Sequence, residues 1–231
     1  MVNIPSYVFT VVKRLESIGF QAYLAGGCVR DSIMNIAPND YDITTNARPE
    51  EIKNVFRDFK LILTGEKHGT VAVITNGGII EITSYRLEKG YTDGRHPDNV
   101  EFTSSLIEDL RRRDFTVNAM AYGIHDGLID PFNGRDDIKN KIIRTVGAPE
   151  KRFEEDALRI LRGLRFSSRL GFSIESGTAE AVHNLRLLLK NISAERIRDE
   201  FVQIIRGQNA GEVLKSYRDV ISVFIPEVIP C

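Results

Sequence analysis

The first twenty residues place apolar side chains at helical spacing. Positions three and four apart are occupied by Ile4, Val8, Val11, Val12, Leu15 and Ile18, and charged residues at 13, 14 and 16 interrupt them. This pattern predicts an amphipathic helix that packs on a core, and it differs from the uninterrupted apolar run of a signal peptide. No apolar run approaches the roughly 20 residues that a membrane span requires, so we expect a soluble protein without a membrane partner.

Runs typical of strands follow this helix. They cover residues 23–25, 61–63, 70–75 and 79–85. The last two runs are joined by residues 76–78, Asn-Gly-Gly, a combination typical of a tight hairpin. Because side chains alternate along a strand, Ile80 and Ile82 are expected to face one side and Glu81 the other. One carboxylate should therefore stand opposite an apolar layer.

Polar and charged residues dominate the next segment. Residues 86–99 are rich in glycine and charge and predict a mobile loop. Ser105 and Glu108 form a capping box, so a helix should begin there. We expect that helix to carry the arginines at 111–113 and Asp114.

Helical periodicity takes over in the last third of the chain. From Lys151 onward no further strand signal occurs, and residues 147–149, Gly-Ala-Pro, break the chain just before it. We therefore expect a domain boundary near residues 138–150. Within this helical part, a buried stripe is expected from Ile197, Phe201, Ile204 and Ile205.

Composition narrows the functional classes. The 231 residues include 31 Lys and Arg against 32 Asp and Glu, a net charge of −1, so a site for a polyanion must come from local clustering. The two cysteines, Cys28 and Cys231, lie far apart in sequence and the four histidines are scattered. This argues against a zinc site and is typical of a cytoplasmic protein. These residues do not define an oligomeric state.

The densest candidate chemistry lies between residues 24 and 50. Gly26 and Gly27 follow a short strand and let the backbone approach a ligand closely, and amides at the start of a following helix favour phosphate. Asp40 and Asp42, in one extended strand, would leave the same face roughly 6–7 Å apart. Two such acids can share divalent cations, and a pair of Mg²⁺ ions activates an attacking oxygen while neutralising a leaving one.

A second candidate begins at residue 156. Asp156, Arg159 and Arg162 follow at helical spacing, beside a parallel row of leucines at 158, 161 and 164. One interpretation is a salt bridge on a basic helix face. The other starts from hydrogen bonding, because a carboxylate only accepts and a guanidinium only donates. Such a pair complements the amino group and ring nitrogen of cytosine or adenine, whereas uracil and guanine would leave mismatches of roughly 1–3 kcal/mol per group.

The order of these motifs resembles the class II tRNA nucleotidyltransferase and bacterial poly(A) polymerase family. The matching segments are GGCVRD, PNDYDITT and ARPEE for the first motif, LRRRDFTVNAMAY for the second, DPFNGRDD for the third, EDALRILRGLRF for the fourth and SAERI for the fifth. The resemblance implies an α/β nucleotidyltransferase head, a mixed sheet with flanking helices, over residues 1–140. An all-helical neck and the start of a body would occupy residues 141–231.

The resemblance also implies roles for individual residues. Asp40 and Asp42 would bind Mg²⁺, and Glu81 would join them as a third catalytic acid. The triphosphate would be positioned by Gly26, Gly27 and Arg30. Arg113 and Asp114 would meet the sugar and phosphate of the nucleotide. Asp156 and Arg159 would select the base, with Arg162 and Arg165 along the same nucleotide, and the SAERI helix would be structural.

These roles imply a template-independent enzyme that adds C and A from CTP and ATP to the 3′ end of tRNA. The loop at residues 86–99 favours full CCA addition. The alternatives are a poly(A) polymerase, a tRNA nucleotidyltransferase that adds only CC or only A, and a truncated, non-catalytic nucleotide- or RNA-binding form. A dinucleotide-binding domain is disfavoured because GGCVRD lacks the GxGxxG spacing. Related enzymes continue into regions that grip tRNA, so RNA docking is expected to be incomplete here.

Overall fold

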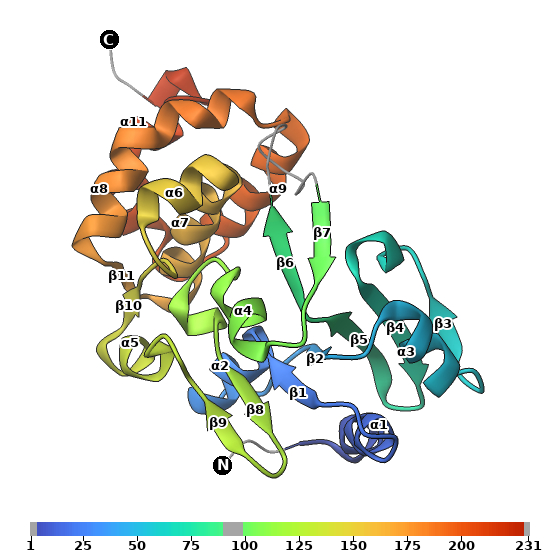
Figure 1. Ribbon diagram of the computed structural model, residues 1–231. Helices are drawn as coiled ribbons and strands as arrows, with labels where there is room; N and C mark the ends of the chain where they lie inside the picture. Colours follow the sequence, from blue (N-terminus) through green and yellow to red (C-terminus); the bar gives the residue numbers. More distant parts are fainter. Residues whose placement is uncertain (1–3, 90–98, 229–231) are drawn as a thin grey trace. The chain divides into compact units, whose positions relative to one another are not determined.

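The computed structural model describes residues 4–89 and 99–228, which fall into two compact units (Figure 1). The first unit comprises residues 4–89, 99–113 and 117–135. The second comprises residues 114–116 and 136–228. Helix α5 (Gly134–Asn140) runs from the first into the second. A domain boundary near residue 140 stays a prediction, and each unit is described by itself.

One mixed sheet organises the first unit. Across the described residues its strand order is β3-β4-β5-β2-β1-β8-β9, with β2 and β5 parallel and the other neighbours antiparallel. The strands predicted from the alternating runs are confirmed. Their bounds are β1 (Ala22–Ala25), β2 (Tyr41–Thr45), β3 (Lys60–Ile62), β4 (Thr70–Thr75), β5 (Gly78–Ser84), β8 (Ala121–Gly123) and β9 (Gly127–Ile129).

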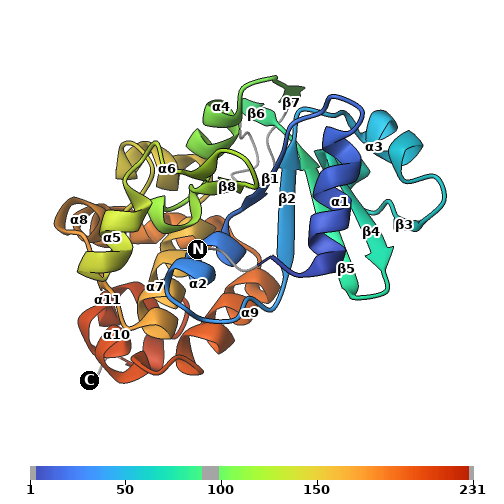
Figure 2. The same ribbon diagram turned by 90° about the horizontal axis from the view of Figure 1, so that it is seen from below.

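Helices cover the apolar face of this sheet. Ile43 on β2 and Ile80 and Ile82 on β5 are buried, as the alternation predicts. Helix α1 contacts β1, α3 contacts β4 and β5, and the two helices contact each other (Figure 2). The predicted N-terminal helix is confirmed, since Val8, Val11, Val12 and Leu15 are buried along one face of α1. Ile18, expected in the same stripe, lies beyond the helix and is 57% exposed. The helices are α1 (Ser6–Glu16), α2 (Gly27–Ile33), α3 (Pro49–Val55) and α4 (Leu106–Arg111), with a 3₁₀ turn at Glu66–His68.

Two predictions in the middle of the chain are wrong in part. The segment expected as a loop starts as strand β6 (Arg86–Lys89), which pairs antiparallel with β7 (Asn99–Phe102). Residues 90–98 of that loop lie outside the described residues. Ser105 does cap α4, its hydroxyl accepting from the backbone N–H of Glu108, but α4 ends at Arg111. Arg112 is the C-cap of α4, so Arg113 and Asp114 lie beyond the helix, where the prediction had placed them within it.

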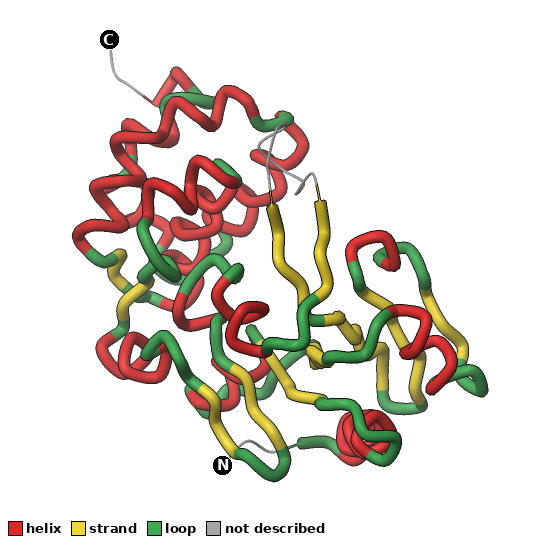
Figure 3. The backbone as a smooth tube through the Cα atoms, in the orientation of Figure 1, coloured by secondary structure: helices red, strands yellow, loops and turns green. Residues whose placement is uncertain are grey.

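Helices make up most of the second unit (Figure 3). A short parallel pair of strands, β10 (Ile142–Ile143) and β11 (Ser173–Ile174), also belongs to it, so the expectation of no strand after Lys151 is wrong. These strands escape sequence reasoning because each has only two residues. The helices are α6 (Pro149–Glu155), α7 (Leu158–Leu170), α8 (Ser176–Leu185), α9 (Ala194–Ile205), α10 (Ala210–Ser216) and α11 (Arg218–Ile221), with 3₁₀ turns at Arg186–Asn191 and Pro226–Val228. A further 3₁₀ turn, Thr116–Asn118, begins in this unit and ends in the first.

The core of the second unit is built around α7. Its leucines at 158, 161 and 164 are all buried, as their spacing predicts. Helix α9 packs against α7 through Ile197 and Ile204, with Phe201 partly buried beside them. Ile205 is 48% exposed, so its assignment to the buried stripe is wrong, because it follows Ile204 by 100° around the helix.

The motif expected to be one continuous helix from residue 155 is interrupted. Helix α6 ends at Glu155, and Asp156 is extended, with φ −146° and ψ 104°. Helix α7 begins at Leu158. Asp156 therefore does not share a helix with Arg159, and the simple spacing argument fails at this residue. Every helix within residues 4–89 and 99–228 is too short or too polar to cross a membrane.

Candidate functional site

Asp42 and Glu81 face each other across neighbouring strands of the first unit. They are register partners in the parallel pair β2–β5, so their side chains leave the sheet on the same side. Their neighbours Ile43 and Ile80 are buried on the opposite face. Burial raises the pKa of Asp42 to about 6, and the negative charge of Glu81 acts in the same direction. The sheet thus brings together two of the three predicted acids.

Asp40 lies one residue before β2, which begins at Tyr41, so the expectation that both aspartates stand in one strand is wrong for Asp40. Its exposed carboxylate adds a smaller upward contribution to the pKa of Asp42, which places it in the same acidic cluster. Across the described residues, no group of three His, Cys, Asp or Glu side chains is arranged to hold a metal ion. The acids still suit a divalent cation such as Mg²⁺, which commonly binds one or two carboxylates and completes its shell with phosphate and water.

A glycine turn lies beside these acids. Gly26 has φ 75° and ψ −130°, a conformation that only glycine adopts readily, and its N–H donates to the carbonyl of Met120 at 3.2 Å. A Cβ atom at Gly26 would lie 2.7 Å from Nη1 of Arg113. The positive charge of Arg113 also opposes the rise in the pKa of Asp42. Arg113 therefore contacts the turn and lies close to the acidic cluster.

Arg30 supports the same turn from α2. Its side chain is buried, and it donates to Asn118 Oδ1 at 2.7 Å and to Asp31 Oδ1 at 2.8 Å. A Cβ atom at Gly27 would meet Arg30 Nη2 at 3.6 Å, an ordinary contact. The guanidinium thus ties α2, which begins at Gly27, to the segment before β8.

Asp109 is a residue of this region that sequence reasoning missed. Its side chain is 0% exposed and accepts hydrogen bonds from Thr44 on β2 and from Arg112. The signal was present in the sequence, because Asp109 precedes Arg112 and Arg113 by three and four residues, the spacing of ion pairs on a helix. The capping box uses Ser105 and Glu108, and it gives no indication of the role of Asp109.

The second unit holds its own charged cluster. Asp114 Oδ2 accepts from Arg162 Nε at 2.8 Å and from Nη2 at 2.6 Å. The nearby carboxylate of Asp114 raises the pKa of Arg162. Arg165 lies 3.3 Å from Glu200 Oε1, and burial lowers the pKa of Arg165. The structure therefore brings together three of the predicted nucleotide-binding residues, Asp114, Arg162 and Arg165. It adds Glu200 of α9, which was not predicted because that helix was expected to be structural.

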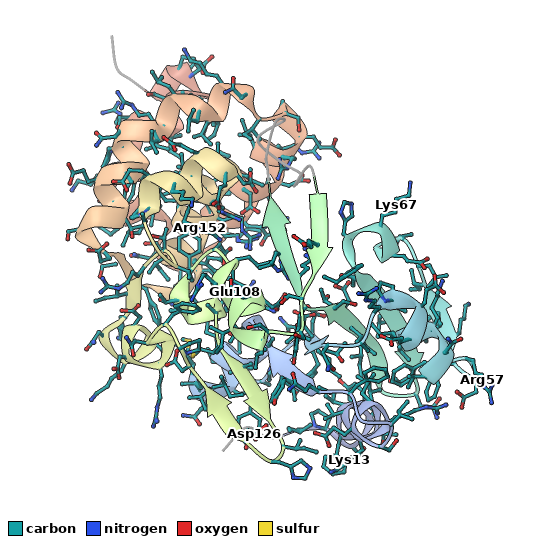
Figure 4. The ribbon with its side chains drawn as sticks, in the orientation of Figure 1. Lys13, Arg57, Lys67, Glu108, Asp126 and Arg152 are labelled. Atoms are coloured by element: carbon teal, nitrogen blue, oxygen red, sulfur yellow. The ribbon has the colours of Figure 1, made fainter. Side chains whose placement is uncertain are left out.

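The residues expected to select a base lie at the junction of α6 and α7. Asp156 Oδ1 accepts from the backbone N–H of Leu158 at 3.0 Å and so caps α7, while Oδ2 lies 3.7 Å from Arg196. Arg159 is buried and donates to Glu155 Oε2 at 2.7 Å. It also donates to the carbonyl of Arg152, which is labelled in Figure 4. The pair thus consists of a capping carboxylate and a guanidinium held by the preceding helix.

Together, a mixed sheet with paired acids beside a glycine turn and a helical unit define a nucleotidyltransferase head and neck. The sequence matches the family described as "Poly A polymerase head domain" over residues 22–144. The chain therefore belongs to the poly(A) polymerase head-domain family. Residues 171–228 match a second family, described as "Probable RNA and SrmB- binding site of polymerase A". Members of the nucleotidyltransferase family generally use a divalent metal ion.

Similar proteins carry a more specific name. The CCA-adding enzyme of Lactobacillus helveticus (strain DPC 4571) is 50% identical over 209 residues, which cover 90% of this chain and 52% of that protein. The crystal structure of the Bacillus stearothermophilus CCA-adding enzyme in complex with CTP matches with a TM-score of 0.84 at 41% identity, over 92% of this chain and 51% of that chain. The Thermotoga maritima CCA-adding enzyme complexed with tRNA_CCA matches with a TM-score of 0.81 at 27% identity, over 98% and 54%. The chain thus spans about half the length of the relatives it matches.

Proposed function

We propose that this chain is the catalytic and nucleotide-selecting part of a CCA-adding tRNA nucleotidyltransferase. The observation that carries the proposal is the in-register pair of Asp42 and Glu81, next to the Gly26 turn and Arg113. The relatives named as CCA-adding enzymes, one in complex with CTP and one with tRNA, support CTP and the tRNA 3′ end as substrates. ATP follows as the source of the A that completes CCA.

The acids suit phosphoryl transfer. Asp40 and Asp42 would hold Mg²⁺, which when bound supplies charge neutralisation at the α-phosphate and activation of the attacking hydroxyl. Glu81 accepts the proton of the RNA 3′-hydroxyl, and that oxygen attacks the α-phosphate as the bond to pyrophosphate breaks. Burial is the main cause of the raised pKa of Asp42, and repulsion from Glu81 and Asp40 adds to it. Both causes support this assignment, because a bound cation stabilises a buried carboxylate that has negative neighbours.

Positively charged groups position the nucleotide. Gly26 and Gly27 let the backbone approach the triphosphate, with Arg30 holding the turn in place. Arg113 meets the sugar and phosphate, as does Asp114. In the helical unit, Asp156 accepts from the amino group of cytosine or adenine, and Arg159 donates to the ring nitrogen. Arg162 and Arg165 lie along the same nucleotide.

Nucleotide incorporation tests the proposal. The chain is incubated with Mg²⁺ and a tRNA lacking CCA, with CTP and ATP supplied singly and together, and the products are separated on a sequencing gel. We expect two residues from CTP alone and three from both nucleotides. Asp42→Ala should abolish incorporation without changing the circular dichroism spectrum. Asp58→Ala, which removes an exposed carboxylate of the same unit, is the matched control. Incorporation by Asp42→Ala at the wild-type rate would reject the acid assignment.

A poly(A) polymerase is the second candidate, and the description of the matching head-domain family favours it. The same assay separates the two activities. With ATP alone, a poly(A) polymerase extends the RNA into a long homopolymer, whereas a CCA-adding enzyme acting on tRNA that ends in CC adds a single A. Addition that stops after CC, or that requires a CC end, would indicate the specialised enzymes instead.

A further inference from the structure

The Asp109 carboxylate joins separate elements of the first unit. Oδ2 accepts from Thr44 Oγ1 of β2 at 3.0 Å and lies 3.6 Å from Arg113 Nη2. Oδ1 accepts from Arg112 Nε at 2.9 Å and from the backbone N–H of Arg86, the first residue of β6, at 3.4 Å. A fully buried carboxylate with donors on both oxygens is held in one orientation.

The three arginines at residues 111–113 differ in their exposure and in the carboxylates they pair with. Arg111 has a side chain that is 60% exposed, and it pairs with Glu108, labelled in Figure 4, on the surface of α4. Arg112 and Arg113 turn inward to Asp109, with side chains 16% and 19% exposed. Burial raises the pKa of Asp109, but the two guanidiniums and the hydrogen bonds outweigh it, so the pKa lies below its ordinary value. Asp109 is therefore a permanent negative charge behind Arg113.

Arg113 lies within the electrostatic reach of two groups of carboxylates. Asp109 Oδ2 lies 3.6 Å from its Nη2. The charge of Arg113 also opposes the rise in the pKa of Asp42, whose strand carries Thr44 two residues further on. Without the charge of Asp109, Asp42 and its partner Glu81 become the acids that attract this guanidinium. A guanidinium bound to Asp42 would compete with a divalent cation for the same oxygens.

We propose that Asp109 is a positioning residue that keeps Arg113 at the Gly26 turn and away from Asp42, so that the acids stay open to a divalent cation. This inference rests on the proposed function, because it assumes a cation at Asp42. Arg113 is then available to the nucleotide phosphate, and Asp42 and Glu81 to the metal. The backbone contact to Arg86 ties the base of the β6–β7 hairpin to the same carboxylate.

Binding of Mn²⁺ to the whole chain without nucleotide, followed by the electron paramagnetic resonance signal of the free ion, tests this inference. Asp109→Asn should weaken Mn²⁺ binding about tenfold, the size of effect expected when an opposite charge moves next to the acids. The double variant Asp109→Asn/Arg113→Met should restore binding to the wild-type level or tighter, because no guanidinium competes. If Asp109 acted only by stabilising the fold, the second change would not restore binding.

Controls separate the possible failures. Glu108→Gln, on the same helix but half-buried and paired with Arg111, should bind Mn²⁺ as the wild type does. Thr44→Val removes one donor to Asp109 and keeps the ion pair, so it should weaken binding two- to threefold in a folded chain even where Asp109→Asn does not fold. If the wild type, Asp109→Asn and Thr44→Val bind Mn²⁺ with equal affinity, the role of Asp109 is overturned, while the proposed metal site at Asp42 still stands. Binding that is unchanged in Asp42→Ala would overturn the metal site of the proposed function and, with it, the inference.

Discussion

Gly26 and Arg113 are so close that a single added carbon at Gly26 would lie 2.7 Å from Nη1 of the arginine. Gly127, at the hairpin between β8 and β9, has nearly the same positive φ, 72° against 75°, but a Cβ there meets nothing within 4 Å. Both glycines have a positive φ, but only Gly26 would place a Cβ atom against a side chain.

The first prediction uses this contrast. Gly127→Ala should lower the free energy of unfolding by about 1 kcal/mol, the cost of a left-handed backbone for alanine. Gly26→Ala should cost about 2–4 kcal/mol, since strain and displacement of a partly buried guanidinium add together. Urea denaturation measures both. Gly26→Ala should also weaken CTP binding, whereas Gly127→Ala should leave it unchanged; equal losses of stability in the two variants would contradict the close contact.

A second prediction concerns the coupling between Asp42 and Glu81. Glu81→Gln removes the largest charge that raises the pKa of Asp42, so this pKa should fall below about 6. It should stay above the ordinary 3.8, because burial is the larger cause and remains. Carbon-detected NMR titration of the Asp42 carboxyl measures the shift, with the exposed Glu50→Gln as a control that leaves it in place. Nucleotide incorporation should fall by about 10²-fold if Glu81 accepts the hydroxyl proton. An unmoved Asp42 titration would contradict the register pair.

The third prediction is a pH dependence of stability. Folding raises the pKa of Asp42 from 3.8 to about 6, so the folded state binds this proton more tightly than the unfolded state. The contribution of Asp42 to stability is therefore greatest below about pH 4, falls as the pH rises through 6 and is constant above. Asp42→Asn does not titrate and should be more stable than the wild type by about 1–3 kcal/mol at pH 8 without metal. The difference should vanish near pH 4.

Calorimetric melts across that pH range measure the difference. Added Mg²⁺ should raise the melting temperature of the wild type at pH 8 and leave that of Asp42→Asn unchanged, because only the carboxylate binds the ion. A difference between the two proteins that stays constant from pH 4 to pH 8 would exclude a raised pKa at Asp42. A parallel response of both proteins to Mg²⁺ would place the ion elsewhere.

Strand alternation made the core of this site predictable from the sequence. Glu81 stands between two buried isoleucines, so its face of β5 followed from a period of two, before any partner strand was known. The pairing of β5 with β2 did not follow, because parallel register depends on tertiary contacts between segments forty residues apart. The same limit applies to Asp109, whose partners Thr44 and Arg86 come from other elements.

Two of the wrong predictions have different physical causes. Periodicity treats residues 155–165 as one helix, but Asp156 leaves the helix and caps the next one with its own side chain. At the end of α9, Ile205 follows a buried isoleucine and has the right hydrophobicity, yet it lies on the exposed side. In both cases the residue type fits the predicted position. The backbone conformation of Asp156 and the position of Ile205 around its helix place the two residues elsewhere.

The last prediction addresses base selection. Asp156→Asn should keep the cap of α7, because an asparagine oxygen can also accept from the N–H of Leu158. Its amide presents both a donor and an acceptor, so it can satisfy the carbonyl of uracil as well as the amino group of cytosine. Incorporation of UTP relative to CTP should therefore rise by about tenfold or more, the effect of removing one unsatisfied buried group. Competition between labelled UTP and CTP on tRNA lacking CCA measures the ratio, and Asp199→Asn, an exposed carboxylate on α9, is the control. If Asp156→Asn lowers both rates equally and leaves the ratio unchanged, Asp156 acts through the cap of α7 alone and the base is read by other residues.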